Sequence, residues 1–235
     1  MTAALLPDGR RLSVADSVRG RVGCGALVVA GAVPGDPGPL AAETEALAVR
    51  LRERHAGREP SAIEGLREAR ALYNAFGMEP SRHRPSSEAL LRRVLQGKGL
   101  YRLGNAVDVG NLASLSFLLP IGLYDLAKVD GDVELRLGAP GEGYDGIRKD
   151  RVNVGGRLSF HDARGPFGSP TSDSLRTCTD EHSTTLLAVV LATAAYDAAA
   201  MSAHLDLLAD LYARHCGARE AWRALLGAAA AGGGT

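Results

Sequence analysis

Hydrophobic side chains recur at two spacings along the chain. A spacing of three to four residues predicts amphipathic helices over 40–55, 61–76, 87–96, 108–119, 197–215 and 218–230. Short apolar runs between glycine, aspartate and proline predict strands over 19–33, 121–127, 133–137, 151–154, 158–161, 175–178 and 186–191. Helices before and after a block of strands indicate an α+β fold, with a central mixed or mostly antiparallel β-sheet flanked by helices.

Local signals mark element ends and suggest a division of the chain. Ser61 followed by Glu64 has the pattern of a capping box and predicts a helix start. The apolar run 186–195 is about half the length of a membrane-spanning helix, so we expect a buried strand there. We divide the chain into three regions: an N-terminal β element and helix packed on the core (1–60), the core (61–196) and C-terminal helices (197–235).

Composition excludes some classes of protein. Apolar residues make up 46% of the chain, so it is not intrinsically disordered as a whole. The 27 basic and 27 acidic residues balance, which removes the simplest argument for non-specific nucleic-acid binding. The start of the chain lacks the pattern of a signal peptide, and three well-separated cysteines have no zinc spacing. We therefore expect a cytoplasmic protein with no cofactor, no metal and no membrane partner.

One stretch departs from this charge balance. Between positions 81 and 102 a single acid, Glu88, accompanies six cations. These cations are Arg82, Arg84, Arg92, Arg93, Lys98 and Arg102. Such a run is typical of a surface that contacts phosphates, and it is equally typical of an ordinary solvated helix face. Both interpretations stay open.

A second stretch carries candidate binding chemistry. Residues 165–174 (GPFGSPTSDS) combine glycines, short hydroxyl side chains and an acid, and an Arg-Thr pair follows at Arg176 and Thr177. Backbone N–H groups and short donors in such a loop are suited to a small ligand. A plain connection rich in proline and glycine is the other interpretation.

Four further motifs, in this order, resemble a known family. They are RPSSEALLRRVLQGKGL (84–100), VDVGNLASL (107–115), LPIGLYDL (119–126) and GDVELRL (131–137). They are similar to the B3/B4 domain of the phenylalanyl-tRNA synthetase β subunit. The likeness is greatest to free-standing B3/B4 proteins, in which a loop like 165–173 precedes an Arg-Thr pair. The resemblance covers about half of the chain, roughly 71–195.

The resemblance implies an α+β editing domain. In the synthetase this domain hydrolyses tyrosine wrongly attached to the phenylalanine tRNA. Asn111 matches the asparagine of the helix beside the editing pocket, and Tyr124 belongs to the matching aromatic-Asp pair. Gly122 stands where the bacterial synthetases carry a histidine that lines the pocket. The sequence therefore implies neither tyrosine specificity nor a histidine role.

The candidate site follows from the two stretches and the resemblance. We expect Asn111 and Asp173 to be the catalytic residues. The expected substrate-binding residues are Ser114, Tyr124, Gly168, Ser169, Thr171, Ser172, Arg176 and Thr177. Asn111 and the hydroxyls would hold the amino acid and a water, while Asp173 would take the α-amino group. Arg176 would brace the loop or meet the terminal phosphate. The six cations of 81–102 are the expected RNA-binding residues.

These residues are consistent with three functions. The first is a trans-editing hydrolase that clears a mischarged amino acid from tRNA. The second is a non-catalytic module that binds tRNA or an amino acid. The third is an enzyme of specialised metabolism that acts on an amino acid or an aminoacyl-tRNA. The expected partners are tRNA or aminoacyl-tRNA and an amino-acid moiety, and the oligomeric state stays open.

Overall fold

The computed structural model describes residues 1–147 and 150–227. Its α-helices are α1 (Pro37–Arg54), α2 (Arg67–Ala75), α3 (Ser86–Leu95), α4 (Asn105–Phe117) and α5 (Ala198–Cys216). The strands in the first part of the chain are β1 (Ala3–Leu5), β2 (Arg11–Val14), β3 (Val22–Ala30), β4 (Ile121–Asp125) and β5 (Val133–Leu137). The later strands are β6 (Gly143–Asp145), β7 (Arg151–Asn153), β8 (Leu158–Asp162), β9 (Gly165–Gly168), β10 (Thr185–Thr193) and β11 (Arg219–Leu226).

The strands form two larger sheets and one hairpin. One sheet has the order β1-β2-β5-β8-β9, the other has the order β11-β3-β10-β4, and β6 pairs with β7. The named strands pair in antiparallel fashion except β2 with β5, which are parallel. The predicted α+β class with a mixed sheet is confirmed.

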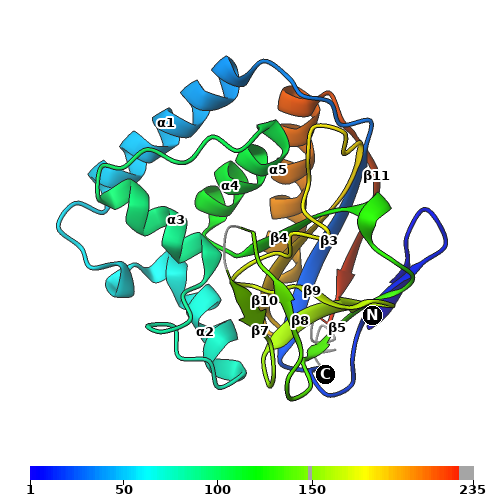
Figure 1. Cartoon of the computed structure of the whole chain (residues 1–235). Coiled ribbons are helices and arrows are strands. Elements are labelled where there is room, and N and C mark those ends of the chain that lie inside the picture. The colour runs from blue at the N-terminus through cyan, green and yellow to red at the C-terminus, as the bar shows by residue number, and fades with distance from the viewer. Residues whose placement is uncertain (148–149, 228–235) are drawn as a thin grey trace, which may run out of the picture.

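The four-stranded sheet is buried on both faces. Val28 of β3 and Val189 of β10 pack with Leu135 and Phe160 of the five-stranded sheet. Alternate residues of β3 and β10 pack against α4 and α5 on the other face. Figure 1 shows α1 and α3 lying outside α4. Because both faces are covered, the sequences of β3 and β10 are nearly continuous apolar runs.

The buried strand predicted at 186–191 is confirmed as part of β10. The last predicted helix, over 218–230, is wrong where the structure describes it. Gly217, with φ of 61°, ends α5 and reverses the chain, and β11 then pairs with β3. The alanine-rich composition favoured a helix, but pairing with an open strand edge overrides this local propensity. Residues 228–230 of the prediction lie outside the described part.

Two other local predictions are wrong. The capping box at Ser61 does not form, and two 3₁₀ turns, Pro60–Ala62 and Glu64–Leu66, precede α2. Ile63 between them is extended, which allows both Ile63 and Leu66 to be buried. The strand predicted over 175–178 is a turn. There the hydroxyls of Ser174 and Thr177 hydrogen-bond each other at 2.9 Å and fold the chain back.

Residues 1–60, which we expected to pack on the core, contribute to its interior. β3 lies between β10 and β11 in the four-stranded sheet, and α1 packs against α3 and α4. Within 1–147 and 150–227, no helix has the length and apolar character needed to cross a membrane.

Candidate active site

A hollow of about 130 Å³ lies between α3, α4, the outer edge of β4 and the turn 169–173. We call it the turn hollow. Six predicted site residues line it, namely Asn111, Ser114, Ser169, Thr171, Ser172 and Asp173. Its remaining lining residues are Ser86, Leu90, Val107, Gly110, Ile121 and Leu123. Residues that are far apart in the sequence thus meet in one small space.

Tyrosines from elsewhere in the chain hold the turn in place. The Tyr144 hydroxyl donates its proton to the Ser172 carbonyl oxygen and lies 3.0 Å from Ser169 Oγ. Ser169 Oγ in turn donates to the same carbonyl at 3.1 Å. The hydroxyls of Tyr73 and Thr171 share a hydrogen bond of 2.7 Å. The turn is therefore ordered before any ligand binds, which lowers the entropy cost of binding.

Helix α4 supplies the opposite wall. Asn111 and Ser114 are three residues apart and so lie on one face of the helix. Ser114 Oγ donates to the Leu119 carbonyl at 2.7 Å, a contact that stabilises the C-terminal end of α4. The Asn111 amide forms no hydrogen bond to another residue of the described chain. Asn111 is therefore the α4 side chain whose polar group is available to a ligand.

Asp173 lies at the end of the turn beside two buried phenols. Burial, and then the Asp173 carboxylate, raises the pKa of Tyr124 well above its usual value. Burial, with Asp173 adding to the shift, also raises the pKa of Tyr144. Both phenols therefore stay protonated near neutral pH. Asp173 lines the hollow, and the Tyr124 and Tyr144 phenols lie close to it.

Two glycines make room for Tyr124. A Cβ at Gly122 would lie 2.3 Å from the Tyr124 hydroxyl, and a Cβ at Gly168 would lie 2.2 Å from it. The ring is fully buried against Phe160 and Phe167, with centroid distances of 5.5 and 4.8 Å. The tyrosine hydroxyl thus occupies the space of a side chain at position 122. Tyr124 and Gly168 shape the site from behind and do not line the turn hollow.

Arg176 and Thr177 brace the far end of the turn. The Arg176 guanidinium makes two hydrogen bonds to the buried Asp162 carboxylate, at 2.8 and 2.9 Å. Burial alone would raise the pKa of Asp162, but hydrogen bonds from Arg176 and from backbone N–H groups hold it below its ordinary value. Thr177 is buried and bonds to Ser174. Of the two roles expected for Arg176, bracing the loop fits these contacts.

Part of the basic stretch pairs with acids of the protein. Glu88 has a side chain only 1% exposed. It accepts two hydrogen bonds of 2.8 Å from Arg70 and one of 2.9 Å from Arg92, and Arg84 lies 3.9 Å away. This group holds α2 and α3 together. Arg92 therefore faces an internal acid as well as the surface.

The other cations are more accessible. Arg82 pairs with the exposed Glu79, and Arg102 pairs with Asp108 at 3.2 Å. Lys98 is exposed. The Arg93 guanidinium lies over the Tyr101 ring, with 3.8 Å from Cζ to the centroid, and Tyr101 is 60% exposed.

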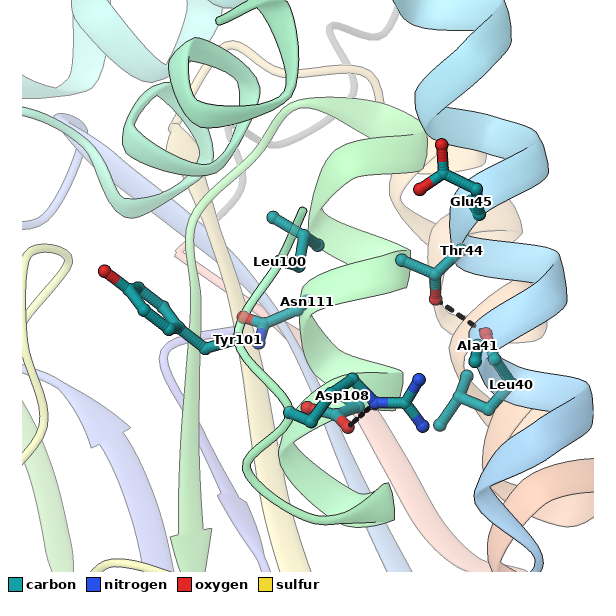
Figure 2. Close-up of a pocket in the computed structure, with 9 residues that line it drawn as sticks. Leu40, Ala41, Thr44, Glu45, Leu100, Tyr101, Asp108 and Asn111 are labelled. Carbon is teal, nitrogen blue, oxygen red and sulfur yellow. Dashed lines mark hydrogen bonds and ion pairs between the residues drawn. The ribbon is translucent and has the colours of Figure 1, made fainter. Parts of the chain in front are cut away.

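Figure 2 shows the residues that line a second hollow, of about 90 Å³. We call it the α1 hollow. Its walls come from α1, from the segment 100–102 and from α4. Asn111 lines both hollows. Figure 2 shows Thr44 and Glu45 on α1 and the Tyr101 ring pointing away from α1.

The sequence analysis did not identify Tyr73, Tyr101 or Tyr144 as site residues. The signal available for them was the tyrosine side chain itself, which combines an apolar ring with a hydroxyl group.

Histidine does not take part in the turn hollow. His161 lies on β8 with Nε2 2.8 Å from Ser159 Oγ, and it faces a different groove beside Arg136. Burial, with a smaller contribution from Arg136, lowers its pKa to about 4.

The α+β fold with a polar hollow between its helices and the edge of a sheet belongs to a known domain family. Residues 68–217 match the B3/4 domain family, so the chain belongs to that family. It is also similar to an N-terminal fragment of the phenylalanyl-tRNA synthetase β subunit from Pyrococcus horikoshii, with 11% identity and a TM-score of 0.46. That match covers 89% of this chain and 49% of the fragment, so the chain spans about half of the fragment's length. No curated protein matches.

Proposed function

We propose that this protein is a trans-editing aminoacyl-tRNA deacylase, which hydrolyses the ester between a wrongly attached amino acid and its tRNA. The observation that carries the proposal is the turn hollow. It brings a carboxylate, an available amide and a set of short hydroxyls into a space the size of a small molecule. The membership of the B3/4 family and the resemblance to the synthetase editing domain favour tRNA as the source of the ester.

The residues of the hollow have distinct roles in this reaction. Asp173 pairs with the α-ammonium group, since an amino acid attached through its carboxyl group is a cation. The Asn111 amide orients the attacking water or the ester carbonyl. Oxygen from water bonds to the carbonyl carbon, the bond from that carbon to the ribose oxygen breaks, and the ribose oxygen takes up a proton. An ester of this kind is already activated, so positioning can supply the rate without a covalent nucleophile.

The arrangement of the two hollows supports one orientation of the bound aminoacyl-tRNA end. Asn111 lines both, so an ester held at its amide would have the amino acid in the turn hollow. The terminal nucleoside would then lie toward Tyr101, whose ring is exposed and backed by Arg93. Unpaired bases stack on such rings in RNA-binding proteins. The accessible cations Arg82 and Lys98 are candidates for phosphate contacts.

The experiment is a deacylation assay on a panel of charged tRNAs, with the wild-type protein and Asp173→Asn. We expect hydrolysis of a subset of the panel and a loss of about 100-fold in Asp173→Asn, the usual effect of removing one partner of a desolvated charge pair. The melting temperature of Asp173→Asn stays close to that of the wild type, because the amide keeps the shape of the side chain. Asp16→Asn changes an exposed acid that does not line the hollow, and it is the matched control.

Three outcomes contradict the proposal. Salt-dependent tRNA binding with no turnover of any charged tRNA indicates the non-catalytic module. Tight binding of a free amino acid with no effect of tRNA indicates the repurposed enzyme of specialised metabolism. Full activity in Asp173→Asn removes Asp173 from the mechanism.

A further inference from the structure

We infer that Tyr124 is a positioning residue, which holds the Asp173 carboxylate in place and makes the site select esters that carry a free α-amino group. The inference rests on the proposed function and deepens it, because it names the part of the substrate that the site recognises. It stands on the way in which β4, β9 and the turn bring a phenol and a carboxylate together.

The turn 169–173 closes a short hairpin that places Asp173 opposite Gly168. These two residues form an antiparallel β-bridge, and next to it the Ser174 N–H donates to the Phe167 carbonyl at 2.9 Å. Residues directly opposite each other in such a pair have their Cβ positions on the same face, about 5 Å apart. The side chain of Asp173 is therefore the neighbour of the empty side-chain position at Gly168.

The Tyr124 hydroxyl occupies that empty position. A Cβ at Gly168 would lie only 2.2 Å from the hydroxyl oxygen. The Tyr124 ring is fixed there, because Phe160 and Phe167 pack against it at centroid distances of 5.5 and 4.8 Å. The hydroxyl thus lies on the same face of the hairpin as the Asp173 side chain.

A buried phenol needs a hydrogen-bond partner, and Asp173 meets this need for Tyr124. The Tyr124 side chain is fully buried, so leaving its hydroxyl without a partner would cost free energy. Burial is the largest cause of the raised pKa of Tyr124, and the charge of Asp173 and a hydrogen bond with it add to the shift. The phenol therefore stays protonated near neutral pH and donates to the carboxylate. A carboxylate held by a fixed donor has fewer orientations open to it.

The lining of the turn hollow makes this carboxylate selective for a cationic ligand. Asp173 is the one acid among the described residues that line the hollow, and those residues include no lysine, arginine or histidine. The ammonium group of a ligand therefore meets a carboxylate without a competing cation in the lining. An N-acylated amino group is neutral and gains no charge pair. The free α-amino group is thus the part of the substrate that the held carboxylate recognises.

The test compares the charged tRNA that the wild type hydrolyses fastest with the N-acetyl derivative of the same ester. We expect wild-type kcat/KM to be about 100-fold higher for the free amine, since acetylation removes the charge pair. Tyr124→Phe keeps the ring and removes the hydroxyl. We expect it to lower this preference about tenfold, through a higher KM for the free amine and little change for the N-acetyl ester. Asp173→Asn brings the preference close to one, and adding Tyr124→Phe to it has no further effect.

Tyr212→Phe is the matched control, because it removes another fully buried hydroxyl. That hydroxyl bonds to the Ala106 carbonyl at 3.1 Å, and Tyr212 does not line the turn hollow. A general loosening of the fold lowers the rates with both esters together and leaves their ratio unchanged. The ratio therefore separates positioning of Asp173 from a purely structural role, and we expect it to be unchanged in Tyr212→Phe.

A second variant reaches the same contact without changing Tyr124. A Cβ at Gly122 would lie 2.3 Å from the Tyr124 hydroxyl, so Gly122→Ala displaces the hydroxyl. We expect the preference for the free amine to fall in this variant too. If Tyr124→Phe does not fold, Gly122→Ala decides the question, and an unchanged preference in it overturns the inference.

The failures of the two proposals can be told apart. Hydrolysis with the same preference in the wild type and in Tyr124→Phe overturns the inference and leaves the deacylase proposal standing. No hydrolysis of any ester overturns the deacylase proposal. The inference is then decided by calorimetric titration with adenosine that carries alanine or N-acetylalanine through a 3′-amide. Tighter binding of the free amine that weakens about tenfold in Tyr124→Phe, and not in Tyr212→Phe, supports the inference. Equal affinity for the two amides, no binding of either, or an unchanged preference in Tyr124→Phe overturns it.

Discussion

The basic stretch 81–102 and the turn 169–173 border the same hollow, but their polar side chains have different partners. In the basic stretch, Arg84 and Arg92 surround the buried Glu88. In the turn, Ser169 and Thr171 are held by tyrosines at their backs and still line the hollow. The first region uses its polarity mainly for stability. The second keeps polar groups within reach of a ligand.

The difference teaches that the density of polar residues in a segment does not show what they contact. The partners come from distant parts of the chain: Arg70 reaches Glu88 from α2, and Tyr144 reaches the turn from β6. A cation that faces a buried acid is a poor candidate for binding phosphate. A hydroxyl that is fixed from behind is a good candidate for binding a small ligand.

The largest expected effect comes from replacing Glu88, the acid of the basic stretch. Glu88→Gln leaves a buried neutral amide beside three arginines that water still reaches. We expect the free energy of unfolding to fall by about 1–3 kcal/mol, because hydrogen bonds to a charged acceptor are lost. Urea denaturation measures this change. Glu79→Gln, which removes an exposed partner of Arg82, is the control and changes stability by less than about 0.5 kcal/mol. Equal stability of the two variants would mean that Glu88 is not a structural centre.

Lowering the pH tests the strands that precede the turn. His161, on the strand that pairs with β9, has a pKa near 4 in the fold against 6.5 when unfolded. The unfolded chain therefore binds a proton first, so this stability is complete above pH 6.5 and is lost as the pH falls from 6.5 toward 4. We expect His161→Gln, which keeps a polar contact to Ser159, to flatten the pH dependence of the melting temperature in that window. An unchanged profile in His161→Gln would contradict the assignment.

A smaller change tests the support of the turn. Tyr144→Phe removes the hydroxyl that bonds to Ser169 and Ser172, at a cost of about 1 kcal/mol in stability. We expect a fall of about tenfold in deacylation, because a looser turn positions Asp173 less well. Tyr196→Phe removes a hydroxyl that contacts His204 outside the hollow, and it is the matched control. Equal activity of both variants would show that the turn needs no support from Tyr144.

The smallest expected effect concerns the accessible cations. Arg82→Glu with Lys98→Glu weakens tRNA binding several-fold at low salt and lowers the salt dependence of binding, because fewer counterions are released. Arg92 is unsuitable for this test, since its replacement also disturbs Glu88. Arg50→Glu on the exposed side of α1 is the control. Unchanged binding in the double variant would remove the stretch from any RNA contact.

Some of the site could be predicted from residues alone and some could not. Asn111 follows from the resemblance to the B3/B4 domain, and Ser114 follows from its place one helical turn later. Ser169 to Asp173 follow from the density of short polar side chains. Signals of this kind lie within short segments, so they can be recognised without knowledge of the fold. The tyrosine supports and the burial of Glu88 depend on contacts between distant segments, which periodicity does not encode. β11 was missed for the same reason, because its pairing with β3 overrides an alanine-rich helical pattern.

The position of β3 has a consequence for how the chain reaches its native state. Ala30 of β3 pairs with Thr185 on one side and with Arg219 on the other. A strand made early in synthesis must therefore wait for two strands made late, with its apolar side chains uncovered in the meantime. Such sequence-distant pairing makes folding slow and exposes the newborn chain to aggregation. The matched segment 68–217 contains neither β3 nor β11. A fragment with those bounds would therefore leave one edge of β10 without a paired strand.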